Sequence, residues 1–98
     1  MTKPISILGI FVADLTFRTD KMPRLGETVI GNSFKLGPGG KGSNQAVAAR
    51  RAGAEIMFIT KISRDTFGEM AMKLYADEGI NSEFIWEIPN IATGAAGI

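Results

Sequence analysis

A glycine-rich run, Gly37–Asn44, constrains the fold of this 98-residue chain more than any other segment. Four of its eight residues are glycine, and a stretch of small residues follows it and ends at Gly53. Glycine lets the backbone turn tightly and come close to a ligand or to another segment. The start of a helix presents unpaired N–H groups and the positive end of the helix dipole. Because Lys41 and Asn44 stand at this start, the run predicts a site for a polar, oxygen-rich ligand.

Two familiar phosphate-binding motifs fit the run poorly. Gly37, Gly39 and Gly42 match the spacing of the dinucleotide fingerprint, which should directly follow a strand and precede an acidic residue by about twenty positions. Glu55 is the nearest acidic residue, but it lies at the start of the next predicted strand. Dinucleotide binding is therefore a minor alternative. The Walker A pattern fails because Lys41 is followed by Gly42 instead of Ser or Thr. A purely structural role for the glycines is a further alternative.

The composition of the chain argues against several classes of protein and of site. A net charge of +1 argues against an electrostatic nucleic-acid binder. The absence of cysteine excludes disulfides and thiolate metal sites, and the absence of histidine removes the commonest general base. No apolar run reaches the length of a membrane span. These features are compatible with a cytoplasmic enzyme.

The order of the predicted elements indicates an α/β fold. Apolar runs predict strands at 5–12, 56–59 and 84–88, and helical periodicity predicts helices at 43–52 and between Asp65 and Gly79. Strands that alternate with helices form a parallel sheet flanked by helices, and the first strand is expected to be buried on both faces. Asp14 is then expected behind the carboxyl end of that strand, where such sheets bind ligands. The alternative is that Asp14 is a turn residue with no role in binding a ligand.

Other segments support structural interpretations. Residues 15–36 combine strand-forming residues with turn signals and predict one or two antiparallel strands that project from the sheet. Asp65 is expected to cap the second helix. Trp86 is expected in the core, and residues 93–98 are expected to begin another strand.

Several motifs together resemble the first signature of the PfkB carbohydrate kinase family, and within it the ribokinases. They occur in the family's order and at similar spacing: Asp14, Pro23–Thr28, Gly39–Ala49, Gly53 and Asp65–Gly68. The resemblance covers nearly the whole chain and implies a three-layer, Rossmann-type fold. It implies that residues 15–36 form a small β lid over the sugar that often pairs subunits into dimers. Family members are much longer, so residues 1–98 are expected to be the N-terminal portion of such an enzyme, natural or truncated.

The resemblance also implies a function and a set of site residues. The complete enzyme would be an ATP-dependent kinase of a pentose such as ribose or deoxyribose, or of a related sugar or nucleoside hydroxyl. Mg²⁺ is implied as well, and activation by a monovalent cation is left open. The catalytic base and the ATP site are expected beyond Ile98, so no catalytic, cofactor or metal residue is assigned in this chain. The implied sugar-binding residues are Asp14, Gly39, Gly40, Lys41 and Asn44.

The match departs from the family at two positions. Ribokinases commonly carry an asparagine where this chain has Val12, and a glycine where it has Ser63. An apolar side chain at position 12 cannot bond a hydroxyl, which makes a 2-deoxypentose a plausible substrate beside ribose and marks Val12 as a residue of the substrate pocket. A separate alternative is a non-catalytic interaction module that dimerises through residues 15–36.

Overall fold

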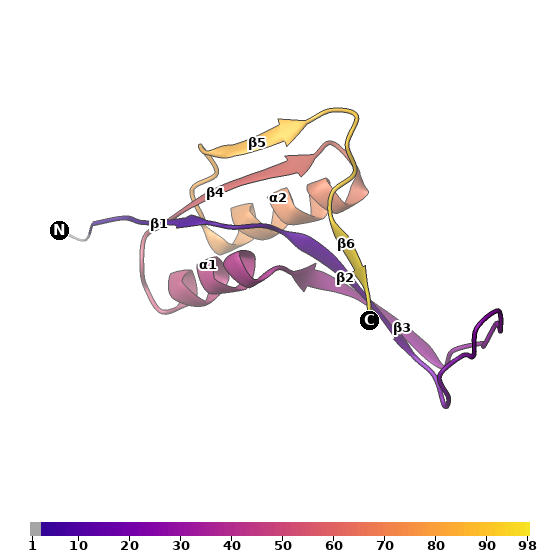
Figure 1. The fold of residues 1–98 in the computed structure, drawn as a ribbon. Coiled ribbons are helices and arrows are strands. Elements are labelled where there is room, and N and C mark those ends of the chain that lie inside the picture. Colours follow the sequence, from indigo (N-terminus) through magenta and orange to yellow (C-terminus); the bar gives the residue numbers. More distant parts are fainter. Residues whose placement is uncertain (1–2) are drawn as a thin grey trace.

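The computed structural model describes residues 3–98, which form two three-stranded sheets and two helices (Figure 1). The elements are β1 (Ile5–Leu8), β2 (Val12–Arg18), β3 (Ser33–Gly39), α1 (Lys41–Arg51), β4 (Ile56–Ser63), α2 (Thr66–Glu78), β5 (Ile85–Ile88) and β6 (Ala95–Gly97). Neither of the helices in this described part is long and apolar enough to cross a membrane.

The main sheet has the strand order β1-β4-β5, and its strands are parallel. The crossover helices α1 and α2 contact each other and β4, so both cover the same face (Figure 1). The predicted parallel sheet with flanking helices is therefore confirmed. The predicted burial of the first strand on both faces is wrong for the described chain, because Leu8 on the other face is 80% exposed. Trp86 on the same uncovered face is 51% exposed, so its predicted place in the core is also wrong.

The second sheet has the order β3-β2-β6. Strands β2 and β3 form an antiparallel hairpin that projects from the body, with residues 19–32 at its tip (Figure 1). The molecule is elongated as a result, measuring 56 × 32 × 19 Å. The further strand predicted to begin in residues 93–98 is present as β6, and it pairs in parallel with the other edge of β2, a pairing that was not predicted. The predicted antiparallel excursion is thus present, and its role as a lid stays a prediction.

The first predicted strand is interrupted, which corrects the expected position of Asp14. Strand β1 ends at Leu8, and Asp14 is the third residue of β2 instead of following a strand end. The break occurs at Gly9, whose backbone packs against α1: a Cβ atom on Gly9 would lie 2.8 Å from the Cα atom of Gly42. The chain therefore leaves the main sheet beneath the start of α1 and enters the second sheet.

The helix ends follow the sequence signals closely. The Asp65 carboxylate accepts a hydrogen bond of 2.8 Å from the Gly68 N–H and caps α2, as predicted. Gly79 ends α2 with a φ of 74°, and Gly53 follows α1 with a φ of 102°. Helix α1 begins at Lys41, two residues before the predicted start at Ser43.

The core lies between the helices and the main sheet and centres on Tyr75. The Tyr75 ring lies 5.2 Å from the ring of Phe58 and 6.4 Å from that of Phe11. Its hydroxyl shares a buried hydrogen bond of 2.8 Å with Ser43 Oγ on α1. Burial raises the pKa of Tyr75, so the hydroxyl keeps its proton at neutral pH. This bond joins α2 to α1 one residue before Asn44.

Candidate functional site

A hollow of about 650 Å³ opens where the second sheet meets the start of α1. It brings together five of the residues singled out from the sequence, and the sixth, Gly39, lies beside it. The residues that line it are Leu8, Gly9, Ile10, Val12, Asp14, Gly40, Lys41, Gly42, Asn44, Gln45 and Ala96. The other lining residues were not predicted for the site: Leu8, Gly9, Ile10, Gly42, Gln45 and Ala96.

Strand β2 supplies the carboxylate of the hollow. Val12 and Asp14 lie on the same face of the strand because side chains alternate along it, and both line the hollow. The Asp14 carboxyl group lies over Gly39 of β3, where a Cβ atom would collide with its oxygens. Gly39 therefore gives the carboxylate room and does not itself line the hollow.

The start of α1 supplies the donors. Gly40 is the N-cap residue with a φ of 96°, a backbone conformation that favours glycine. A Cβ atom at Gly40 would also collide with the carbonyl oxygen of Ile10. No side chain caps this helix, so the N–H groups of its first turn, which begins beside the hollow, have no side-chain acceptor at the cap. Lys41 and Asn44 follow on the first turn.

The charge of the hollow suits a neutral polar ligand. Within residues 3–98, the side chains of Asp14, Lys41 and Asn44 make no hydrogen bond or ion pair with one another or with other side chains. One carboxylate, one ammonium group and the two amides of Asn44 and Gln45 provide acceptors and donors with no net charge. A pyrophosphate group would face the Asp14 carboxylate, which argues against the dinucleotide alternative.

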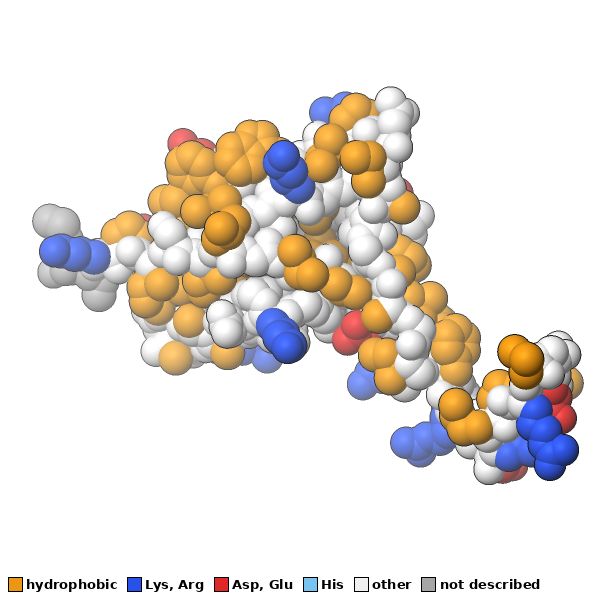
Figure 2. All heavy atoms as spheres, viewed as in Figure 1, with side chains coloured by type: hydrophobic (Ala, Val, Ile, Leu, Met, Phe, Trp, Pro, Cys, Tyr) orange, Lys and Arg blue, Asp and Glu red, His pale blue; other side chains and the backbone are white. Residues whose placement is uncertain are grey.

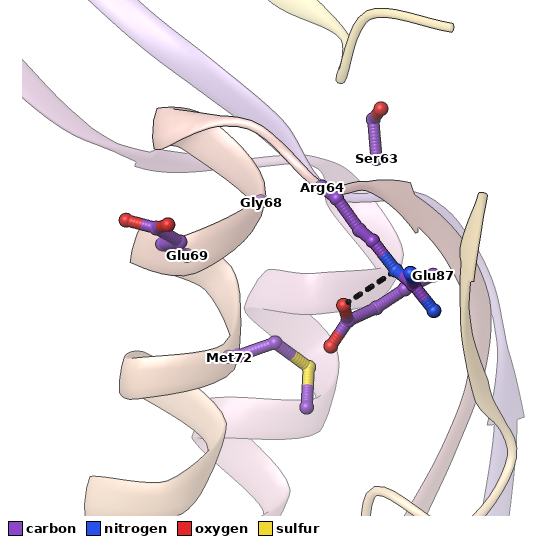
Figure 3. A pocket seen from close by; sticks show the side chains of 6 residues that line it. All are labelled: Ser63, Arg64, Gly68, Glu69, Met72 and Glu87. Atoms are coloured by element: carbon purple, nitrogen blue, oxygen red, sulfur yellow. Dashed lines mark ion pairs between the residues drawn. The ribbon is translucent and has the colours of Figure 1, made fainter. Parts of the chain in front are cut away.

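A second hollow of about 390 Å³ lies beside the start of α2 (Figure 3). Three of its polar side chains already have partners: Arg64 pairs with Glu87 at 3.4 Å, and Ser63 Oγ donates to the backbone carbonyl of Ile88 at 3.0 Å. The serine that departs from the family pattern therefore makes a structural bond. Across residues 3–98, no cluster of three or more acidic side chains is placed to hold a metal ion.

Thr93 joins the Asp65 carboxylate, a contact that the sequence analysis missed. The Thr93 N–H donates to one carboxylate oxygen at 2.8 Å, and the Thr93 hydroxyl donates to the other at 2.6 Å. The hydroxyl also accepts a bond of 2.9 Å from the Ser63 N–H. Thr93 stands 28 residues after Asp65, and no local pattern marks such a distant partner.

The Asp65 contacts predict a pH dependence of stability. Hydrogen bonds from the Thr93 hydroxyl, the Thr93 N–H and the Gly68 N–H lower the pKa of Asp65. A carboxyl pKa below its unfolded value adds stability above that unfolded value, and this stability is lost as pH falls through the folded pKa. We expect the difference in unfolding free energy between wild type and Asp65→Asn to be largest near neutral pH and to shrink below about pH 4. Urea unfolding across this range measures it.

The matched control is Asp77→Asn, which removes an exposed carboxylate that pairs with Lys73. We expect a small effect from this change, because exposed ion pairs stabilise by only about 0–1 kcal/mol. A difference between wild type and Asp65→Asn that stays constant from neutral to acid pH would contradict the assignment.

Comparisons with known proteins identify the family of this chain. The family model described as pfkB family carbohydrate kinase matches residues 2–98. A ribokinase of Bacillus subtilis is 37% identical over 94 residues, which cover 96% of this chain and 32% of that protein. A deoxyribokinase of Salmonella typhi is 36% identical over 94 residues, or 96% of this chain and 31% of that protein. The chain thus spans about a third of the length of these curated relatives.

Solved structures show the same fold. A ribokinase of Giardia lamblia superposes with a TM-score of 0.88 at 34% identity, covering all of this chain and 32% of that one. A ribokinase of Arabidopsis thaliana complexed with ribose and ATP superposes with a TM-score of 0.89 at 25% identity, covering 99% of this chain and 32% of that one. The chain therefore has the fold of the N-terminal part of a ribokinase.

Proposed function

The chain belongs to the pfkB family of carbohydrate kinases, and we propose that the complete protein transfers a phosphoryl group from ATP to a pentose, ribose or deoxyribose. The relatives named ribokinase and deoxyribokinase support the substrate class, and the Arabidopsis structure with ribose and ATP supports the donor. A related sugar or nucleoside hydroxyl is the wider form of this proposal. The observation that carries it is the gathering of Asp14, Lys41 and Asn44 around one hollow. A cytoplasmic location is part of the same proposal.

The described residues would position the acceptor sugar. Phosphoryl transfer depends mainly on positioning and on stabilising charge. Asp14 would accept hydrogen bonds from two hydroxyls, and such charge-assisted bonds are roughly twice as strong as neutral ones. Lys41 and the Gly40 N–H would donate, and Asn44 would donate and accept. The catalytic base and the ATP site would belong to the rest of the complete protein. Mg²⁺ would likewise be held by the rest of the complete protein.

The role of Asn44 is tested by Asn44→Ala in the complete protein. Loss of hydrogen bonds to the sugar should raise KM for the sugar about tenfold, since each bond contributes roughly 1 kcal/mol. Steady-state kinetics with ribose and 2-deoxyribose measure the change. Asn81→Ala is the control, because Asn81 is exposed and its side chain, within residues 3–98, accepts a hydrogen bond only from the nearby Glu83 N–H. An unchanged KM in Asn44→Ala would remove Asn44 from the site.

We propose in addition that Val12 favours a 2-deoxypentose. Val12 lines the hollow on the same face of β2 as Asp14, so it would contact the same side of the sugar. A hydroxyl buried against this apolar side chain would lack a partner, at a cost of about 1–3 kcal/mol. A sugar without that hydroxyl avoids the cost. The similarity to a deoxyribokinase supports this preference, and the equal similarity to ribokinases keeps ribose as the alternative.

The substitution Val12→Asn tests this preference. The asparagine amide should form a hydrogen bond with the ribose hydroxyl that has no partner beside valine. This bond should raise kcat/KM for ribose relative to 2-deoxyribose about tenfold. Val12→Ala is the control, because it changes the size of the pocket without adding a donor or acceptor. A wild-type enzyme that strongly prefers ribose would contradict the proposal.

The hairpin supports a second proposal, that two copies of the protein pair through it. Phe17 and Phe34 lie opposite each other on its apolar face, with ring centroids 5.2 Å apart, and they are 57% and 56% exposed. Leu36 on the same face is 42% exposed. Hydrophobic side chains continue from the body along the hairpin in Figure 2. Exposed apolar patches of this kind mark contact surfaces.

The substitution Phe17→Glu should shift the complete protein from dimer to monomer in sedimentation equilibrium. Thr16→Glu adds the same charge one residue away on the opposite face, and it should leave the dimer intact. If both variants sediment like wild type, the hairpin is not the interface. Dimerisation without saturable sugar binding would favour the interaction-module alternative over the kinase.

A further inference from the structure

The hollow is assembled from two structural units. The second sheet supplies Val12, Asp14 and Ala96, whereas the body, formed by the main sheet and its helices, supplies Lys41 and Asn44. Their relative placement therefore decides whether the Asp14 carboxylate lies at the right distance from the donors on α1. The chain passes between the units at 9–11, at 40 and at 89–94.

The third of these connections is fixed by side-chain hydrogen bonds. The Asp65 carboxylate at the start of α2 holds both the N–H and the hydroxyl of Thr93, at 2.8 and 2.6 Å. The Thr93 hydroxyl in turn accepts the N–H of Ser63 at the end of β4. Thr93 is 7% exposed. We name this group of contacts among Asp65, Thr93 and Ser63 the latch.

The residues after the latch run directly to the hollow. The Gly94 carbonyl accepts the N–H of Ala13 at 2.9 Å. Strand β6 then pairs with residues 13–15, which places Ala96 opposite Asp14. Only two residues separate Thr93 from Ala96, so a shift of Thr93 is transmitted to the strand that flanks Asp14.

Helix capping alone does not account for the latch. A cap needs one carboxylate oxygen, and Oδ1 of Asp65 already serves the Gly68 N–H. The second oxygen, Oδ2, is used by the Thr93 N–H, and the Thr93 hydroxyl is both donor and acceptor. The cluster thus connects the end of β4 and the start of α2 to the segment 89–94.

We propose that Asp65 and Thr93 are positioning residues for the sugar site, and that they lock the second sheet to the body so that Asp14 faces Lys41 and Asn44. This inference rests on the proposed function for its kinetic consequence. Neither residue lines the hollow, so both act through β6 and β2.

The test compares Thr93→Val with Thr93→Ser in the complete protein. Valine keeps the shape and removes the hydroxyl, while the Asp65 cap on α2 remains; serine restores the hydroxyl. Ile80→Val, a buried change at the far end of α2, controls for general destabilisation. The readouts are the amide hydrogen exchange of Ala13 and Phe17, which bond the 94–98 segment, and the separate values of KM and kcat.

Thr93→Val should speed exchange at both amides about tenfold and raise KM for the sugar about fivefold, with kcat within about twofold of wild type, because a small misplacement weakens binding. Thr93→Ser and Ile80→Val should resemble wild type in both readouts. Faster exchange with an unchanged KM would overturn the positioning role. Unchanged exchange would show that the latch does not hold the second sheet to the body. If the wild-type protein phosphorylates no sugar, the proposed function fails. The difference in amide exchange between Thr93→Val and Thr93→Ser then tests by itself whether the latch holds the second sheet to the body.

Discussion

The close approach of α1 to the connection between β1 and β2 is the constraint on which the rest of the structure depends. Gly9 and Gly42 touch through their backbones, and the carbonyl of Ile10 occupies the space that a side chain at Gly40 would need. This contact ends β1, directs β2 out of the main sheet and sets the first turn of α1 beside it. The carboxylate of Asp14 and the donors of α1 come together as a consequence.

Helix α2 holds this arrangement without lining the hollow. At one end, Asp65 binds Thr93 and so anchors the second sheet. In its middle, Tyr75 bonds Ser43 of α1 inside an aromatic cluster. Each neutral hydrogen bond contributes a net of about 1 kcal/mol, but a buried partner left alone costs about 1–3 kcal/mol. Removing one partner of either anchor is therefore expected to lower the stability as well as to affect the elements that the anchor joins.

Sequence reasoning succeeded where the determining forces are local. Both helices, their glycine ends and the Asp65 cap were predicted because capping depends on neighbours in the chain. The break after Leu8 was missed because the apolar run continues across it, and only the contact with Gly42 in space explains it. The exposure of Trp86 was missed because burial depends on what packs against a face.

In the candidate site, too, the features that depend on nearby residues were predicted and those that depend on distant segments were not. The residues predicted from the glycine run and its motif neighbours gather around one hollow, since most of them are close in sequence and Asp14 is brought in by the hairpin. Ala96 could not be predicted, because parallel pairing of β6 with β2 joins segments about eighty residues apart. Thr93 could not be predicted either, because its partner Asp65 lies 28 residues before it and no local pattern links the two.

The most direct test is a crystal structure of the complete protein with bound ribose or 2-deoxyribose. We expect sugar hydroxyls within hydrogen-bonding distance, about 2.6–3.2 Å, of the Asp14 carboxylate and the Asn44 amide, with the sugar in the hollow between the second sheet and α1. A sugar bound elsewhere, with Asp14 and Asn44 free of it, would contradict the account.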